Sequence, residues 1–171
     1  MTGTIRLRRL TVRDAAAVQA IVEADPGYSE RVSGRPAGPR EGRALLLGRP
    51  PGFPADRKIV LGAYAEEQPD ELVAVVDLLV GWPKPTCAHV GLLQVRAASH
   101  GRGVGRRVHE QLLAEVGRWP EVDTLRAAIV ETNAEVAEPF WQAMGYRPTG
   151  PPRPYRNGTV DTTLRIWTRP V

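Results

Sequence analysis

The chain has 171 residues, 42% of them hydrophobic, which is typical of one compact domain covering residues 1–171. Residues 72–80 form the longest apolar run, which contains Asp77 and is too short to cross a bilayer, and residues 1–14 lack an apolar signal region. A single cysteine, Cys87, excludes an internal disulfide framework. We therefore expect a soluble, cytoplasmic protein that has no membrane partner.

The net charge is +4, which suggests an anionic partner such as a nucleic acid, a membrane surface or a phosphorylated small molecule. Most arginines are scattered among 19 acidic residues, and we expect them to form a solvated surface. The one dense cluster comprises Arg102, Arg106 and Arg107. No helix-turn-helix pattern or basic sheet with interleaved aromatics is present, so the sequence does not favour a nucleic-acid partner.

The first half of the chain predicts three strands and two helices. Residues 4–10 alternate apolar and charged side chains, as a half-buried strand does, and residues 11–25 carry a helix signal that begins with Thr11 as N-cap. Residues 26–54 are rich in proline and glycine, with one helical candidate at residues 39–48, and we interpret them as a lid or a wall of an acceptor site. Strands at 57–65 and 71–82 should pair as a hairpin through the turn at 66–71.

The second half predicts strands that alternate with helices. After the break at residues 82–86, a strand at 87–95 leads into a glycine-rich turn and a helix at 104–119, whose apolar stripe recurs every four residues. A strand at 124–130, a helix at 134–144 and an alternating strand at 160–168 follow. This order predicts an α/β fold with a mixed sheet flanked by helices.

The glycine-rich turn lies between a strand and a helix N-terminus. Gly101, Gly103 and Gly105 occupy every second position, with Arg102 and Arg106 beside them. Because a helix start exposes unpaired N–H groups and glycine lets an anion approach the backbone, this arrangement predicts a phosphate cradle. The spacing fits neither the dinucleotide fingerprint nor the P-loop.

The segment "HGRGVG" resembles the Q/R-x-x-G-x-G/A signature of the GNAT N-acyltransferase superfamily, which binds the pyrophosphate of coenzyme A. The stretches "GLLQVRAASHGRGVG" and "IVETNAEVAEPFWQAMGYRP" are similar to the strand before that signature and to the strand and helix after it. The resemblance implies a mixed, mostly antiparallel sheet of about seven strands with about four helices. It also implies direct transfer of an acetyl group from acetyl-CoA to a primary amine of a small molecule or peptide.

The resemblance assigns the acetyl-CoA contacts residue by residue. Leu93, Gln94 and Val95 would offer backbone groups to the pantetheine arm, one N–H polarising the thioester carbonyl, and Asn133 would contact the arm near the sulfur. Trp141 stands where family members often carry a tyrosine that protonates the leaving thiolate, and an indole is no useful acid. The pyrophosphate contacts would come from His100, Gly101, Arg102, Gly103, Val104, Gly105 and Arg106.

For the residues that would bind and deprotonate the acceptor amine, the sequence leaves alternative roles open. Asp77, inside an apolar strand, and Glu131, at a strand end, are candidate bases whose pKa burial would raise; we favour Asp77, although it equally fits a satisfied polar residue of the sheet. Tyr28 and Trp82 are candidate walls of the acceptor pocket, or caps on a core edge. His109 lies off the apolar stripe of its helix, so we expect it at the surface.

A second function remains open, namely an acyl-CoA or nucleic-acid binding module without turnover. Cys87 and His89 form a lone Cys-x-His pair, so we expect no metal. The sequence identifies neither the acceptor amine nor the acyl length, and both a monomer and a homodimer remain possible.

Overall fold

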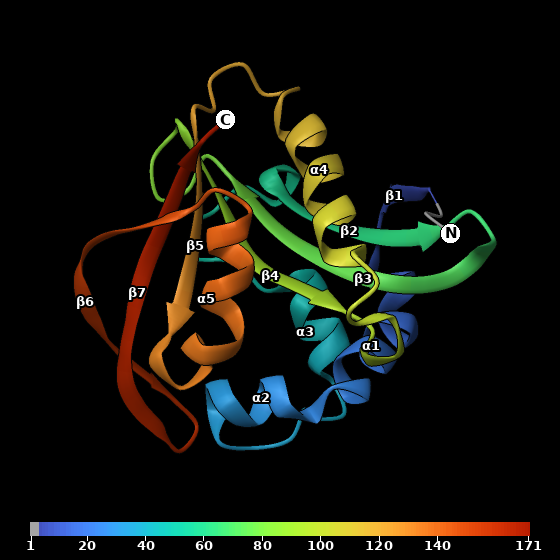
Figure 1. Ribbon diagram of the computed structural model, residues 1–171, viewed down its shortest axis with the longest axis horizontal. Helices are drawn as coiled ribbons and strands as arrows, with labels where there is room; N and C mark the ends of the chain where they lie inside the picture. Colours follow the sequence, from blue (N-terminus) through green and yellow to red (C-terminus); the bar gives the residue numbers. More distant parts are fainter. Residues whose placement is uncertain (1–3) are drawn as a thin grey trace.

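The computed structural model describes residues 4–171, in which seven strands form one sheet in the order β1-β2-β3-β4-β5-β7-β6 (Figure 1). All neighbouring strands are antiparallel except β4 and β5, which are parallel. The predicted mixed, mostly antiparallel sheet is therefore confirmed. The strands span Ile5–Arg9 (β1), Lys58–Ala65 (β2), Gln68–Val80 (β3), Cys87–Val95 (β4), Thr124–Val130 (β5), Arg147–Asn157 (β6) and Val160–Pro170 (β7).

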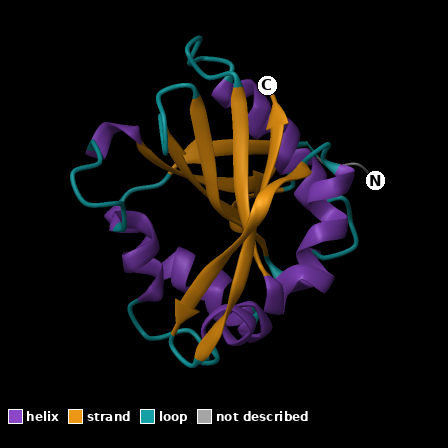
Figure 2. Cartoon of the chain, turned by 90° about the vertical axis from the view of Figure 1, so that its left-hand side faces the viewer, coloured by secondary structure: helices purple, strands orange, loops and turns teal. Residues whose placement is uncertain are grey.

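Five α-helices accompany the sheet and lie on both of its sides (Figure 2). Buried residues of α4 and α5 belong to the apolar core on one face, and those of α1 and α3 belong to the core on the other face. Among residues 4–171, no helix is both long and apolar enough to span a bilayer. The helices span Ala15–Ala24 (α1), Pro26–Ser33 (α2), Glu41–Leu47 (α3), Val104–Val116 (α4) and Ala134–Ala143 (α5).

Helix α4, which follows the glycine-rich turn, shows the predicted apolar stripe but differs from the prediction at His109. The four stripe residues Val104, Val108, Leu112 and Val116 are all buried in the core. His109, which we expected at the surface, is only 1% exposed and forms a 3.1 Å hydrogen bond between its Nε2 and the Tyr146 hydroxyl. The surface prediction is wrong because the chain after α5 packs Tyr146 against this side of α4, which widens the buried face beyond the stripe.

The proline- and glycine-rich segment contains α2, which its weak apolar pattern did not predict. Pro26 occupies the first turn, where proline is well tolerated, and Gly34 caps the end in a left-handed conformation with its N–H on the Glu30 carbonyl at 2.8 Å. The helix therefore depends on its two ends and on tertiary contacts, since only Ser29 in it is buried.

Strand β6 was also missed, because it contains four prolines. It lies at the edge of the sheet and pairs only with β7. Its prolines, which lack an N–H donor, can therefore occupy positions that face away from the partner strand. The hairpin turn after β2 is shorter than predicted, since β3 already begins at Gln68. Pro69 is accommodated there because the β2–β3 register is irregular between Ala63 and Ala65.

Candidate functional site

The site is built around a gap between the two parallel strands. β4 and β5 pair only from Cys87 to Val90 and from Thr124 to Ala127, although both strands continue beyond these residues. Figure 1 shows the two strands diverging from that point. Residues 92–95 of β4 therefore have a strand partner on the β3 side alone, and their backbone groups toward β5 are available to a ligand.

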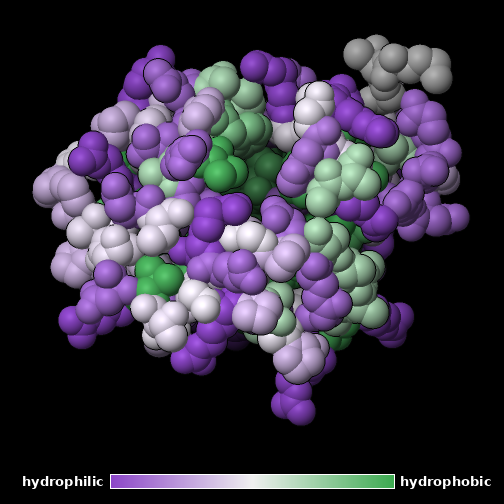
Figure 3. All heavy atoms as spheres, turned by 60° about the horizontal axis from the view of Figure 1, so that its bottom comes forward, coloured by the Kyte–Doolittle hydropathy of each residue, from purple (hydrophilic) through white to green (hydrophobic). Residues whose placement is uncertain are grey.

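A cavity of about 530 Å³ occupies this gap. Its wall is formed by β4, the glycine-rich turn, the start of α4, the end of β5 and α5. Figure 3 shows apolar residues inside a hollow that hydrophilic side chains surround. The predicted acetyl-CoA residues that line the cavity are Leu93, Gln94, Val95, His100, Gly101, Gly103, Val104, Gly105, Arg106, Asn133 and Trp141.

The glycine-rich turn leaves open space where a side chain would stand. Gly101 and Gly103 both have left-handed backbones, with φ of 73° and 71°. A Cβ built on Gly101 would meet no atom within 4 Å, and one on Gly103 only Arg107 Nη1 at 3.5 Å. Gly105 is constrained differently, since its Cβ would lie 3.0 Å from the Phe140 ring. Glycine is favoured at positions 101 and 103 because the backbone there has a positive φ, and at position 105 because a side chain would press on the Phe140 ring.

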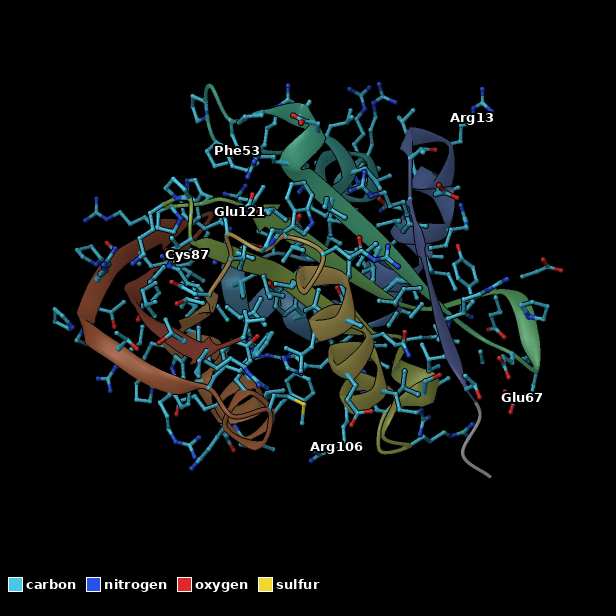
Figure 4. All side chains as sticks on the ribbon, turned by 90° about the horizontal axis from the view of Figure 1, so that it is seen from above. Arg13, Phe53, Glu67, Cys87, Arg106 and Glu121 are labelled. Carbon is cyan, nitrogen blue, oxygen red and sulfur yellow. The ribbon has the colours of Figure 1, made fainter. Side chains whose placement is uncertain are left out.

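The N-terminus of α4 faces the same cavity and is not capped by a side chain. Gly103 is its N-cap residue and supplies no side-chain hydrogen bond, so the first N–H groups of a 13-residue helix are unpaired by side chains. Arg102 and Arg106 are exposed beside them, and Figure 4 shows Arg106 projecting outward from the first turn. This end of α4 combines free donors, the helix dipole and arginine charge, and is suited to bind a phosphate.

Two side chains brace the turn through hydrogen bonds to backbone carbonyls. His100 Nε2 lies 2.8 Å from the Val95 carbonyl oxygen, and Arg107 Nη2 donates to the Arg102 carbonyl at 3.1 Å. Arg102 itself is not part of the cavity wall. Of the predicted pyrophosphate residues, the glycines and the start of α4 line the cavity, while His100 also ties the turn to β4.

A bulge in β4 decides which side chains face which helices. Asp77 pairs with Leu92 and Leu78 with Val90, so Gly91 has no partner on β3. Across this extra residue the alternation of faces is inverted: Val90 and Leu93 both belong to the core under α4, while Leu92 packs in the core on the other face. The bulge lies where β4 leaves β5, so the strand is irregular at the centre of the gap.

Trp141 closes the cavity from α5. It is buried, and its ring meets Phe140, Tyr146 and His109 edge to face, with centroid separations of 5.2, 4.8 and 6.2 Å. Burial lowers the pKa of His109 to about 4, with smaller contributions from nearby arginines, so the imidazole is neutral at physiological pH. Trp141 thus fills an aromatic position without offering an acidic group.

Asn133 joins the cavity to α2. It ends the short helical turn Glu131–Asn133 (η4), and its Oδ1 accepts a 2.7 Å hydrogen bond from Arg31 Nε. Thr132 next to it donates its hydroxyl to the Arg31 carbonyl. Sequence reasoning missed Arg31, because no local pattern signals a contact between segments so far apart in the chain.

The side chain of Asp77, the candidate base, lies next to the bulge residue Gly91. Its side chain is 17% exposed, and a Cβ on Gly91 would lie only 2.9 Å from Asp77 Oδ2. Burial raises the pKa of Asp77, although Lys58 opposes the shift through an ion pair with an Nζ–Oδ1 distance of 2.5 Å. Lys58 is only 5% exposed and was not predicted. Asp77 is adjacent to the cavity without being part of its wall.

The other candidate base, Glu131, does not meet the condition we set for it. It is exposed at the first position of its turn and lines neither cavity. Glu131 therefore lacks the buried environment that we expected, because the turn points this residue to solvent. Within residues 4–171, no three metal-ligating side chains gather closely enough to hold an ion.

Tyr28 stands between the large cavity and a second one of about 320 Å³. Leu92 and Gln94 are the other residues shared by both walls, and the second cavity also reaches Glu41 and Gly158. Burial, with help from Tyr155 and Asp77, raises the pKa of Tyr28 to about 12. Its hydroxyl therefore stays protonated at neutral pH and can donate a hydrogen bond.

Trp82, the other predicted acceptor residue, lines neither cavity. It follows β3, and its ring lies 5.0 Å from that of His89, between centroids, and 4.9 Å from the Arg126 guanidinium carbon. Arg126 was not singled out from the sequence, because its position in a strand of small apolar residues carries no motif. Both residues lie near the paired part of β4 and β5, beside the gap.

Comparisons with known proteins agree with this geometry. The family model described as "Acetyltransferase (GNAT) family" matches residues 33–146. A search of curated proteins finds no match. The fold is similar to an acetyltransferase from Thermus thermophilus, with 25% identity, a TM-score of 0.77, and coverage of 98% of this chain and 97% of that one.

Two further structures share the fold. One is a GCN5-related N-acetyltransferase from Kribbella flavida, with 23% identity, a TM-score of 0.69 and 98% coverage of both chains. The other is a proposed acetyltransferase from Salmonella typhimurium with its cofactor acetyl-CoA, with 17% identity, a TM-score of 0.65, and coverage of 98% and 94%. Since the family match spans most of the chain and includes the gap, the bulge and the glycine-rich turn, the protein belongs to the GNAT acetyltransferase family.

Proposed function

We propose that the protein transfers an acetyl group from acetyl-CoA to a primary amine. The observation that carries this proposal is the continuous cavity from the free edge of β4 to the uncapped start of α4. Such a cavity presents strand-like donors and acceptors at one end and a phosphate cradle at the other. Acetyl-CoA has an amide-bearing arm followed by a pyrophosphate, in the same order.

The open space at the glycine-rich turn supports pyrophosphate binding there. A Cβ on Gly101 would meet no atom within 4 Å and one on Gly103 only the end of the Arg107 side chain, so a side chain at either position would enter this space. Gly103 is left-handed and the helical Val104 after it is right-handed, an alternation that points successive N–H groups to one side and favours an anion there. Arg106 at the rim adds long-range attraction.

The free edge of β4 would hold the pantetheine arm, and acetyl-CoA supplies the acetyl thioester when it is bound. Backbone N–H and C=O groups of residues 92–95 would form strand-like hydrogen bonds with the arm. An N–H beside the bulge would polarise the carbonyl that the amine attacks. Asn133 and Trp141, from η4 and α5, would confine the arm from the other side.

Proton transfer would be carried out by residues on the side of the cavity where the amine would bind. An alkylamine has a pKa near ~10 and must lose a proton, and Asp77 is the carboxylate closest to the bulge that can accept it, directly or through water. The leaving thiol has a pKa near ~8.5, so it needs no strong acid. Tyr28 remains protonated and would donate a hydrogen bond in the acceptor pocket.

The test is a transfer assay with acetyl-CoA and a panel of primary amines. Release of free thiol and the mass of the acetylated amine should both depend on the protein. Acetyl-CoA binding without any acetylated product would favour the alternative of a binding module, and binding of DNA or RNA in its place would contradict the proposal. The proposal includes a single domain over residues 1–171, a cytoplasmic location, no metal, and a monomer or homodimer.

A further inference from the structure

A buried cation lies on the acceptor face of the sheet. Arg126 of β5 is only 9% exposed. Its Nη1 is 2.9 Å from His89 Nδ1, and its guanidinium lies over the Trp82 ring. Within residues 4–171, no carboxylate comes within ion-pair distance of it. A guanidinium withdrawn from water without an acidic partner is costly, so this arrangement favours an anion from outside.

The surroundings of Arg126 do not neutralise its charge. Burial lowers the pKa of His89 to about 3, and the Arg126 charge adds to this effect, so His89 is a neutral acceptor. Burial lowers the pKa of Arg126, and the charge of Arg153 on β6 adds a smaller effect in the same direction. The imidazole at 2.9 Å is neutral and therefore does not compensate the charge of Arg126.

The strand register locates this cation relative to the proposed chemistry. Arg126 and Ala128 are two residues apart on β5, so they face the same side and lie about 6.6 Å apart. Ala128 is part of the wall of the large cavity, whereas Arg126 itself lines neither cavity. His89 pairs with Arg126, and Asp77 pairs with Leu92 further along β4. Arg126 is thus behind the bulge, on the sheet face that carries Asp77.

We propose that the acceptor amine carries a carboxylate, which Arg126 binds while the amine faces Asp77. This inference rests on the proposed acetyl transfer and narrows its acceptor to amino acids or similar zwitterions. A guanidinium offers two parallel donors that match the two oxygens of a carboxylate. Trp82 and His89 hold the guanidinium plane in position, so Trp82 contributes to the acceptor site as a positioning residue.

The experiment compares glycine, 3-aminopropanoate and 4-aminobutanoate, each with its own carboxamide, as acceptors. At least one carboxylate should show a KM lower than that of its carboxamide by about tenfold or more, the value of one charge-assisted hydrogen bond. Arg126→Gln should remove this difference by raising the KM of the carboxylate, with kcat less affected. Arg126→Lys should retain part of it. The affinity for acetyl-CoA should stay unchanged in both variants, which also shows that they fold.

Arg165→Gln is the matched control, because Arg165 pairs with Ile129 and is exposed on the opposite face of the sheet. Equal KM values for carboxylates and carboxamides, or a preference that survives in Arg126→Gln, would overturn the inference. If no amine is acetylated, calorimetric titration of the acetyl-CoA-loaded protein with the same pairs separates the two proposals. Binding of a carboxylate that depends on Arg126 would support the subsite and refute acetyl transfer, and absence of such binding would refute the subsite.

Discussion

Trp141 is the residue at which this chain departs most clearly from the pattern that it resembles. Its ring is enclosed by Phe140, Tyr146 and His109, and no acidic group of the described chain takes the place of a tyrosine hydroxyl on this helix. The proposed chemistry tolerates this, because a thiol leaves readily near neutral pH. The shape of the aromatic side chain is then the property that matters.

Trp141→Phe should therefore keep most of the turnover with acetyl-CoA, since the two side chains fill similar apolar space and neither donates a proton. Trp141→Ala should lower the free energy of unfolding by about 3–5 kcal/mol and weaken acetyl-CoA binding, because it opens a cavity beside the arm. Steady-state kinetics and chemical denaturation of both variants provide the comparison. A loss of turnover in the Phe variant with affinity intact would assign the indole N–H a specific role.

The Asp77–Lys58 pair allows a base to be distinguished from a structural carboxylate. Asp77→Asn leaves Lys58 buried without a partner and should cost about 3–5 kcal/mol of stability as well as turnover. The double variant Asp77→Asn, Lys58→Met removes both charges and should recover much of the stability. If Asp77 is the base, turnover stays low in the double variant.

The pH profile gives a second reading of the same pair. Because burial raises the pKa of Asp77 and only the ionised form can accept a proton, wild-type turnover should rise with pH through that pKa. The double variant should lack this step. Recovery of wild-type turnover and pH profile in the double variant would make Asp77 a structural residue.

At the scale of elements, local sequence patterns predicted most strands and helices, and long-range packing accounts for the rest. The alternation in β1 and β7 and the four-residue stripe of α4 are local signals. β6 forms only because an edge position tolerates prolines, and α2 only because other segments hold its end. The bulge at Gly91 depends on the register with β3, which no single strand encodes.

The docking of α2 on the β6–β7 turn is testable. Thr159 donates its N–H to the Ser33 carbonyl at 3.0 Å, and a Cβ on Gly158 would lie 2.1 Å from that oxygen. Gly158→Ala should displace α2, which carries Tyr28, and raise the KM of the acceptor more than the Kd of acetyl-CoA. Gly150→Ala, at a similar positive φ with open space around it, controls for backbone strain. Equal effects of the two variants on KM would contradict the account.

For the molecule as a whole, the buried His109 and the half-buried His89 link stability to pH. The pKa of His89 is about 3 and that of His109 about 4 in the fold, against about 6.5 in an unfolded chain. The unfolded state then binds more protons below pH ~6.5, so the free energy of unfolding should be largest above that pH and fall steadily as the pH drops toward 4.

His109→Gln should reduce this dependence. Urea denaturation of the wild type and of this variant between pH 7 and pH 4.5 measures the difference. A free energy of unfolding that stays flat across this range would show that neither imidazole is held neutral by burial.

The sequence predicted the proposed coenzyme half of the site more completely than the proposed acceptor half. The part of the cavity wall that we assign to the coenzyme was predicted nearly residue by residue, because it is a contiguous strand, turn and helix with a recognisable glycine spacing. The proposed acceptor half combines Tyr28, Lys58, Asp77 and Arg126, which lie on four different elements, and no local sequence pattern relates these elements to one another. Glu131 illustrates the limit, since a strand end in the sequence did not reveal that the turn faces solvent.

The central claim is that acetyl-CoA binds with its pyrophosphate on the glycine-rich turn, and calorimetric titration of Gly103→Glu tests it most directly. The added carboxylate would enter the open space above the start of α4, so acetyl-CoA binding should be lost while circular dichroism shows the fold retained. Gly52→Glu is the matched control, because Gly52 has a φ of 75° with nothing near its Cβ, and it should bind acetyl-CoA like the wild type. Unchanged affinity in Gly103→Glu would contradict the account.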